Sequence, residues 1–348
     1  MSVRVFLLSF FVIFYAVHAY SSFTFSGKKH LVNGCKIFSL SGTQIKRTPG
    51  EFCQFLDNGD FLSMSSKTLK YITKNGEVKW SVENQLFHHQ MNLSPDRRRV
   101  LALGSTEKEI QGRLFRVDQF YVIDISNGKI LHKVDSEELM KKSDVNPTTL
   151  GLGFPKNHFK AIEEYSHFNS FYEIPKLNVA KKIHSALQPG NLIVNSIGLG
   201  ILIVDSKFEK ILLKQKLDQS FLHHVHDVQV TERGTLIAFN NLNATKDLLV
   251  FSSVVELDSL SFKTLREFKA EPASLFLSHH CGGVQDLGSG LVLFSHNYAG
   301  VFIYNFISKK MVYSNFKVFL DGERILPAQQ IKIENLDSFL KNNTSTVF

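Results

Sequence analysis

The sequence is poor in cysteine, tryptophan and proline, with three, one and eight of each in 348 residues. Three cysteines are too few for a disulfide-rich scaffold, and their spacing fits no metal-binding pattern. Cys35 and Cys53 are able to pair in an oxidising compartment, and the sequence leaves open whether they do. We therefore predict no disulfide framework and no metal site built on cysteine.

Long apolar runs are missing after the first residues. Arg4 precedes an apolar run over residues 5–17, and Val17-His18-Ala19 is an acceptable small-residue cleavage site. The run is shorter than the roughly 20 residues of a membrane-spanning helix. Residues 1–19 thus predict a signal peptide and a periplasmic or secreted protein without a transmembrane segment, with an uncleaved anchor as the alternative.

Clustered charge of one sign is also missing. The formal net charge is +8, which suits an anionic ligand or surface, but the lysines are spread over expected turns. No basic helix with interleaved aromatic residues is found, so we expect no nucleic-acid partner. By contrast, apolar residues make up 43% of the chain and include 31 phenylalanines, enough for a large packed core.

Two kinds of short hairpin alternate along the chain. One kind is an apolar strand, a turn and a second strand that begins near a lysine; it recurs at residues 37–42, 69–80, 121–131, 201–213, 254–265 and 301–312. The other kind has its turn at Asp57-Asn58-Gly59, Ser94-Pro95-Asp96, Pro189-Gly190, Arg233-Gly234 and Ser289-Gly290. Such turns between apolar strands are strong hairpin signals.

Two hairpins in each repeat make a four-stranded unit, which is typical of a β-propeller. The predicted fold is therefore all-β, a six-bladed β-propeller of four-stranded antiparallel blades, with an irregular all-β sandwich as the alternative. We expect one propeller domain over residues 20–348, with an insertion at about 135–165 that is a lid or an inert decoration. Ser136 and the acidic residues after it predict a short helix at the start of this insertion.

Histidines recur at the start of successive repeats. His89, His167 and His226 take corresponding places, Gly282 takes that place in the next repeat, and His88, His224 and His280 lie close by in the sequence. Because the first strand of each blade lines the axis of a propeller, these residues should share one cavity.

Imidazole is suited to nucleophilic attack, to acid–base work and to metal binding. Metal is the weaker option, since there is no HExxH motif and Asp227 is the one nearby carboxylate, although three histidines can form a zinc site. Asp227 is expected either to orient an imidazole or to cap a turn.

Several of these segments, taken together and in order, resemble the bacterial arylsulfate sulfotransferase family. The similarity extends from about residue 35 to residue 313. The matching segments are Leu86-Phe87-His88-His89-Gln90 with Tyr121-Val122-Ile123-Asp124 and Gly128-Lys129, His167-Phe168-Asn169-Ser170, His226-Asp227 with residues 234–241, and Gly283-Val284-Gln285-Asp286-Leu287 with Ser289-Gly290.

The resemblance implies an enzyme that transfers a sulfuryl group from an aryl sulfate to a phenol, without a nucleotide donor or other cofactor. His226 would be the nucleophile that is transiently sulfated, while His89 and His167 would bind the sulfuryl oxygens and handle the phenol proton. We expect further substrate contacts from the neighbouring polar residues His88, His224, Asn169, Asn195, Asp227 and His280. The oligomeric state is not predicted.

Two positions depart from the family pattern. The family has an arginine shortly after the His-x-Asn-Ser element, but the stretch over residues 194–197 has none, so a bidentate donor to the sulfate is missing there. Gln90 also stands in place of an aspartate. These departures leave an alternative: a catalytically impaired propeller that binds a sulfated or anionic ligand or a protein partner. A quinone-dependent propeller would need more tryptophan, and a sugar-processing one a carboxylate pair.

Overall fold

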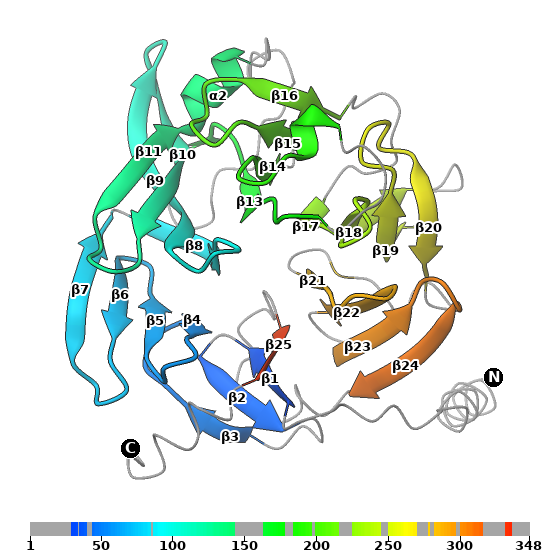
Figure 1. Cartoon of the computed structure of the whole chain (residues 1–348). Coiled ribbons are helices and arrows are strands. Elements are labelled where there is room, and N and C mark those ends of the chain that lie inside the picture. The colour runs from blue at the N-terminus through cyan, green and yellow to red at the C-terminus, as the bar shows by residue number, and fades with distance from the viewer. Residues whose placement is uncertain are drawn as a thin grey trace, which may run out of the picture.

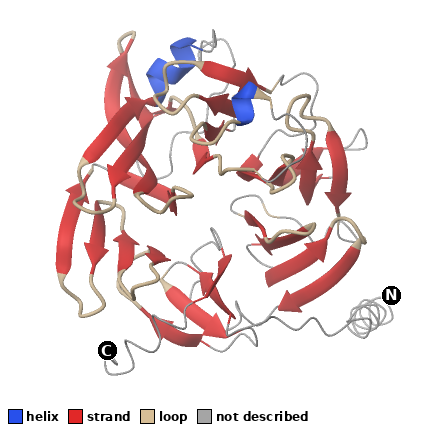
Figure 2. Cartoon of the chain, viewed as in Figure 1, coloured by secondary structure: helices blue, strands red, loops and turns tan. Residues whose placement is uncertain are grey.

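The computed structural model shows a protein built almost wholly from β-strands (Figure 2). It describes residues 29–33, 35–39, 44–84, 86–142, 163–177, 184–196, 199–215, 225–244, 250–269, 278, 282–296, 300–315 and 331–335. The sheets stand in a ring, each with one strand near the centre and its last strand at the rim (Figure 1). This arrangement is a β-propeller, as the repeating hairpins predict.

Each sheet runs in chain order from the centre outwards, except that the strand next to the C-terminus is the inner strand of the first sheet. The innermost strands are β4 (Phe52–Phe55), β8 (Leu86–Leu93), β13 (Phe168–Glu173), β17 (Val225–Val230), β21 (Gly283–Asp286) and β25 (Ile331–Asn335). The second strands are β1 (Lys29–Asn33), β5 (Phe61–Met64), β9 (Arg99–Ile110), β14 (Leu192–Ser196), β18 (Leu236–Ala244) and β22 (Leu291–His296).

The two outer strands of each sheet form the first kind of hairpin, in which a lysine lies near the start of the second strand. The third strands are β2 (Lys36–Ser39), β6 (Thr68–Ile72), β10 (Arg113–Asp124), β15 (Gly200–Val204), β19 (Val250–Leu257) and β23 (Gly300–Asn305). The rim strands are β3 (Gln44–Arg47), β7 (Val78–Glu83), β11 (Ile130–Asp135), β16 (Ile211–Lys214), β20 (Thr264–Phe268) and β24 (Lys310–Asn315).

The prediction of six four-stranded antiparallel blades needs a correction. Five sheets have four antiparallel strands, whereas the sheet of β8 to β11 has a fifth strand, β12 (Glu163–Glu164), which pairs in parallel with β10. The reason is that β9 and β10 are 12 residues long each, so β10 extends past β11 and leaves a free edge. Residues from the predicted insertion cover that edge.

The ends of the described chain meet in one sheet. Strand β25 pairs antiparallel with β1 over five residues, from Lys29 opposite Asn335 to Asn33 opposite Ile331 (Figure 1). The sequence analysis assigned no strand to residues 331–335. A disulfide joins Cys35, in the turn between β1 and β2, to Cys53 in β4 of the next sheet. The pairing that the sequence left open is thus present.

The hydrophobic core consists of layers between neighbouring sheets. The layer next to β12 is rich in phenylalanine: the Phe120 ring lies 4.8 Å from Phe168, 5.3 Å from Phe171 and 5.2 Å from Phe208, between ring centroids. All four rings are buried. Because these contacts join β10, β13 and the turn after β15, they fix one blade against the next.

The predicted insertion begins with the expected helix, α2 (Ser136–Lys142). Glu137 and Glu138 lie in its first turn, where acidic side chains favour a helix. Most of the remaining insertion, residues 143–162, lies outside the described residues, as does the predicted signal peptide over residues 1–19. Within the described part of the chain, no helix has the length and apolar character needed to cross a bilayer.

Candidate active site

Three innermost strands are irregular at the same level of the propeller. The ladders of β8, β13 and β17 each carry a register shift, after His88, between Phe168 and Ser170, and between Val225 and Asp227. A β-bulge of this kind bends the strand and redirects a side chain. His89, in the first bulge, has a φ of 56°, a conformation that few residues other than glycine adopt.

These irregular strands bring the predicted histidines together. The ring of His89 lies 5.5 Å from that of His167, 5.5 Å from that of His226 and 4.9 Å from that of His88, between centroids. His226 is 7% exposed and lies in β17, whereas His167 lies just before β13. The sequence prediction that the three rings share one place is in agreement with this geometry.

His88 connects the cluster to a buried carboxylate. Its Nε2 atom lies 3.1 Å from Asp118 Oδ1 and 3.1 Å from the Gly104 carbonyl oxygen, and its Nδ1 atom lies 2.6 Å from His89 Nδ1. Asp118 Oδ2 accepts hydrogen bonds from the Phe168 amide (2.9 Å) and the Ser166 hydroxyl. Burial alone would raise the pKa of Asp118, but these bonds and the charges of His88 and Arg116 lower it, so the group is a carboxylate.

A second carboxylate orients His167. Glu164 Oε2 accepts a hydrogen bond from His167 Nδ1, and Glu164 Oε1 forms an ion pair with Arg116. Burial would raise the pKa of Glu164, but the hydrogen bond from His167 and the charges of His167 and Arg116 lower it overall. The bond to Glu164 fixes the orientation of the His167 ring.

The environment of His89 favours a neutral ring. Burial lowers its pKa well below the ordinary value of 6.5, and the nearby charges of His88, His226, His167 and Arg116 lower it further. A neutral imidazole has one nitrogen that accepts and one that donates. His89 is therefore set up to exchange a proton with a substrate rather than to hold a permanent charge.

The asparagines predicted to bind substrate have a structural task. Asn169 Nδ2 and Asn195 Nδ2 both donate to the carbonyl oxygen of Val225, at 2.9 and 2.7 Å, and Asn195 Oδ1 accepts from the Ser170 hydroxyl. Asn169 and Asn195 are 1% and 0% exposed. They hold β17 against the preceding blade directly before His226, so both amide donors have a structural task, and a substrate contact of these two residues stays a prediction.

The carboxylate of Asp227 also joins two blades. Its Oδ2 atom accepts a hydrogen bond of 3.0 Å from the backbone amide of Val284, at the start of β21, and the residue is 1% exposed. This bond differs from both predicted tasks, orienting an imidazole and capping a turn. His224 and His280, predicted as substrate contacts, lie outside the described residues. No group of three or more metal-ligating side chains is found in the part that the structure describes.

The sequence analysis missed Arg116, Asp118 and Glu164. Arg116 and Asp118 are two residues apart in β10, where the neighbouring positions Phe115, Val117 and Phe120 are buried. Charges at alternate positions of an otherwise apolar strand are the signal that was available, because such charges are rarely buried without a partner. Glu164 lies three residues before His167, but nothing in that spacing predicts a strand.

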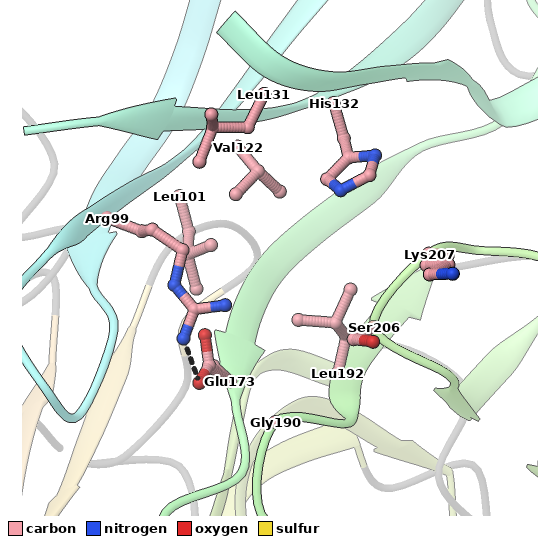
Figure 3. A pocket seen from close by; sticks show the side chains of 10 residues that line it. All are labelled: Arg99, Leu101, Val122, Leu131, His132, Glu173, Gly190, Leu192, Ser206 and Lys207. Atoms are coloured by element: carbon pink, nitrogen blue, oxygen red, sulfur yellow. Dashed lines mark hydrogen bonds and ion pairs between the residues drawn. The ribbon is translucent and has the colours of Figure 1, made fainter. Parts of the chain in front are cut away.

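A separate hollow of about 140 Å³ lies between the sheets of β8–β11 and β13–β16. Figure 3 shows Arg99 and Glu173 side by side in its wall, joined by an ion pair of 2.8 Å, with His132 and Lys207 across from them. Arg99 is the first residue of β9 and lies next to the turn after Leu93. Gly104, which contacts His88, lies towards the opposite end of the blade. None of the residues predicted for the site lines this hollow.

The fold and the site together define a β-propeller with an axial histidine cluster supported by the carboxylates of Asp118, which is buried, and Glu164, which is half-buried. The sequence profile of the family described as Arylsulfotransferase (ASST) matches residues 61–313, which is most of the chain and includes the whole cluster. The chain belongs to the arylsulfotransferase family.

Among solved structures, the chain is similar to a protein of unknown function from Bacteroides caccae, with 14% identity, a TM-score of 0.54, and coverage of 88% of this chain and 99% of that one. This likeness concerns the fold alone. A chain of a mitotic checkpoint complex has 8% identity and a TM-score of 0.45, with coverage of 85% and 74%, too low to carry an argument. No curated protein matches the sequence.

Proposed function

We propose that this protein is an exported sulfotransferase that transfers a sulfuryl group from an aryl sulfate to a phenolic acceptor through a sulfohistidine at His226. The observation that carries the proposal is the convergence of His89, His167 and His226, each with its ring within 5.5 Å of another ring of the cluster. Membership of the arylsulfotransferase family supports the sulfotransferase-like activity.

The proposed reaction has two displacement steps at sulfur. In the first, a nitrogen of His226 forms a bond to sulfur, the bond from sulfur to the aryl oxygen breaks, and the leaving phenolate takes up a proton. In the second, the oxygen of the acceptor phenol attacks sulfur, the N–S bond breaks, and the phenol proton passes to a base. In this proposal His89 and His167, whose rings lie 5.5 Å apart, bind sulfuryl oxygens and exchange this proton.

Arg116 supports the proposal at the point where the sequence departs from the family. Its guanidinium pairs with Glu164, lies close enough to lower the pKa of His89, and comes from β10 instead of from residues 194–197. Its buried Nε atom has no hydrogen-bond partner among the described residues. A sulfate group carries oxygens that a guanidinium binds well, so Arg116 would supply the positive charge that the missing arginine does not.

Export to the periplasm or the exterior is part of the proposal. It is supported by the apolar N-terminal run and by the disulfide between Cys35 and Cys53, because disulfides persist mainly in oxidising compartments. Cell fractionation, with N-terminal sequencing of the recovered protein, tests it. Recovery of the unprocessed chain from the cytosol would contradict it.

Covalent catalysis is tested with 4-nitrophenyl sulfate as donor and phenol as acceptor. We expect release of 4-nitrophenol and, when phenol is left out, a mass increase of about 80 Da on the peptide that contains His226. The variant His226→Ala should lose both signals. His184→Asn is the matched control, because His184 is exposed and caps a short 3-10 helix that asparagine can also cap.

A second candidate is a propeller that binds a sulfated or anionic ligand, or a protein partner, without turnover. The absence of an arginine over residues 194–197 and the structural use of Asn195 favour it. Calorimetric titration with 4-nitrophenyl sulfate separates the two. Binding that His226→Ala leaves intact, with neither adduct nor 4-nitrophenol from the unaltered protein, would replace the enzyme by this binding module.

A further inference from the structure

A line of hydrogen-bonding groups leads from the protein interior to the histidine cluster. Asp118 Oδ1 lies 3.1 Å from His88 Nε2, His88 Nδ1 lies 2.6 Å from His89 Nδ1, and the centroid of the His89 ring lies 5.5 Å from those of His167 and His226. Asp118 is 0% exposed, whereas His88 and His89 are half-buried. The arrangement joins a buried negative charge to the place where a substrate would bind.

The partners of His88 determine where its proton sits. Nε2 faces only acceptors, the carboxylate of Asp118 and the carbonyl of Gly104, so this nitrogen carries hydrogen. In a neutral His88 ring, Nδ1 then has a lone pair and accepts from His89 Nδ1. In a charged His88 ring, Nδ1 donates instead, and His89 Nδ1 accepts.

We propose that Asp118 and His88 form a proton relay with His89, in which one proton on His88 changes His89 Nε2 from an acceptor into a donor. With His88 neutral, His89 Nε2 has a lone pair and acts as a base. With His88 charged, His89 Nε2 bears hydrogen and acts as an acid. His89 is neutral in both states, and the positive charge lies on His88 beside Asp118.

The charges around the relay favour this distribution. His89 faces His167, His226 and Arg116, so a cation on its ring would lie among positive groups. A cation on His88 instead lies 3.1 Å from the Asp118 carboxylate, which Arg116 and the Phe168 amide hold ionised. Opposite charges at such a distance in a buried place interact much more strongly than in water.

The relay accounts for the proton in both steps of the proposed reaction, and it therefore rests on the proposed function. When the donor ester breaks, the leaving phenolate takes the proton from His89 Nε2, and the His88 Nδ1 proton moves to His89 Nδ1. When the acceptor attacks, its hydroxyl proton binds to His89 Nε2, and the His89 Nδ1 proton returns to His88 Nδ1. One proton is released and one is taken up, so no further reactant is needed.

Nitrogen-15 NMR of histidine-labelled protein tests the relay without any turnover. We expect two forms: a charged His88 beside a neutral His89 with its hydrogen on Nε2, and a neutral His88 beside a neutral His89 with its hydrogen on Nδ1. Asp118→Asn removes the carboxylate beside Nε2 of His88 and should favour the second form. A charged His89 beside a neutral His88, or a His89 tautomer that does not change, would refute the relay even in an active enzyme.

Kinetics provide the second readout. His88→Gln should lower kcat/KM for 4-nitrophenyl sulfate by about 10²- to 10⁴-fold and remove one limb of its pH profile, because general acid–base catalysis is lost. His132→Gln is the control, since His132 is exposed on β11. Circular dichroism verifies the fold of each variant. An unchanged pH profile in a folded His88→Gln protein would also refute the relay. If the unaltered protein is inactive but shows the expected His88 charge and His89 tautomer in the NMR spectra, only the proposed function is wrong.

Discussion

Arg116 and His167 bind opposite oxygens of the same carboxylate, that of Glu164. Arg116 comes from β10 and His167 from the segment before β13, so the carboxylate joins two blades at the level of the histidine cluster. Because Glu164 belongs to β12, the strand that pairs in parallel with β10, the extra strand of this sheet has a direct connection with the site. The first prediction follows from this connection.

Replacement of Arg116 should weaken the binding of an anionic substrate. Removing a charge-assisted hydrogen bond costs about 1.5–3 kcal/mol, so Arg116→Gln should raise KM for 4-nitrophenyl sulfate by roughly 10- to 100-fold. Arg113→Gln is the matched control, because Arg113 is exposed on the same strand and its guanidinium lies over the ring of Phe115. Equal KM values for the two variants would remove Arg116 from the binding of sulfate.

The lowered pKa of His89 makes stability depend on pH in a defined direction. An unfolded chain protonates this ring as the pH falls below about 6.5, whereas the folded protein does not until its lower pKa is reached. The stability is therefore full above pH ~6.5 and decreases as the pH falls from there towards the folded pKa. Thermal melts that follow the fluorescence of Trp80, the single tryptophan, should show a smaller decrease for His89→Gln than for His132→Gln.

Asn195 should contribute to stability more than to substrate affinity. Asn195→Ala leaves the Ser170 hydroxyl without its acceptor and removes one of two donors to the Val225 carbonyl oxygen, which costs about 1–3 kcal/mol for each buried group left without its bond. Urea titration should show a lower midpoint. A variant with unaltered stability but a raised KM would instead restore Asn195 to the substrate-binding residues.

Gly282 should tolerate no side chain. A Cβ atom there would lie 2.4 Å from the Phe239 ring, and its φ of +147° is one that other residues rarely adopt. We expect Gly282→Ala to destabilise the protein by about 2–4 kcal/mol, from overpacking and backbone strain together. Gly76→Ala is the control, since its added Cβ meets no atom within 4 Å. If both variants unfold at the same urea concentration, this packing has no consequence for stability.

The disulfide should stabilise the contact between the first two sheets. Cys35 and Cys53 are 18 residues apart, and a loop of that size corresponds to about 3 kcal/mol. Cys53→Ser should lower the free energy of unfolding by that order, and a reducing agent should have the same effect on the unaltered protein but not on the variant. Sensitivity of the variant to reductant would show that the lost stability has another origin.

The repeating features of the fold could be predicted from the sequence, whereas the features that occur once could not. Turns such as Asn75-Gly76 and Asn127-Gly128 mark hairpins because glycine accepts a positive φ, 88° and 74° here. Similar distances from the turns of the other hairpin type, seven residues from His89 to Asp96 and eight from His226 to Gly234, then put the two histidines at one level. Strand β25 pairs with a partner almost the whole chain away, and no local pattern encodes that pairing.

The supports of the site were missed for the same reason. Asp118 and Glu164 contact His88 and His167 through the fold of one extended sheet, so their sequence neighbourhoods contain no repeat to compare. The structural task of Asn195 was not predicted, because an asparagine close to a cluster of histidines indicates a ligand contact, whereas the bond to Val225 depends on how adjacent blades approach each other.

The pairing of β1 with β25 also bears on biosynthesis. Residue 29 is made early and residue 335 late, yet they are opposite each other in one ladder. During translation and any transport across a membrane, the inner edge of β1 therefore stays open until nearly all the other strands exist, and an open strand edge readily recruits another polypeptide. Aggregation of newly made chains should thus depend on how soon β25 pairs with β1. A chaperone, or slow release of the chain during transport, would keep other chains away from this edge until then.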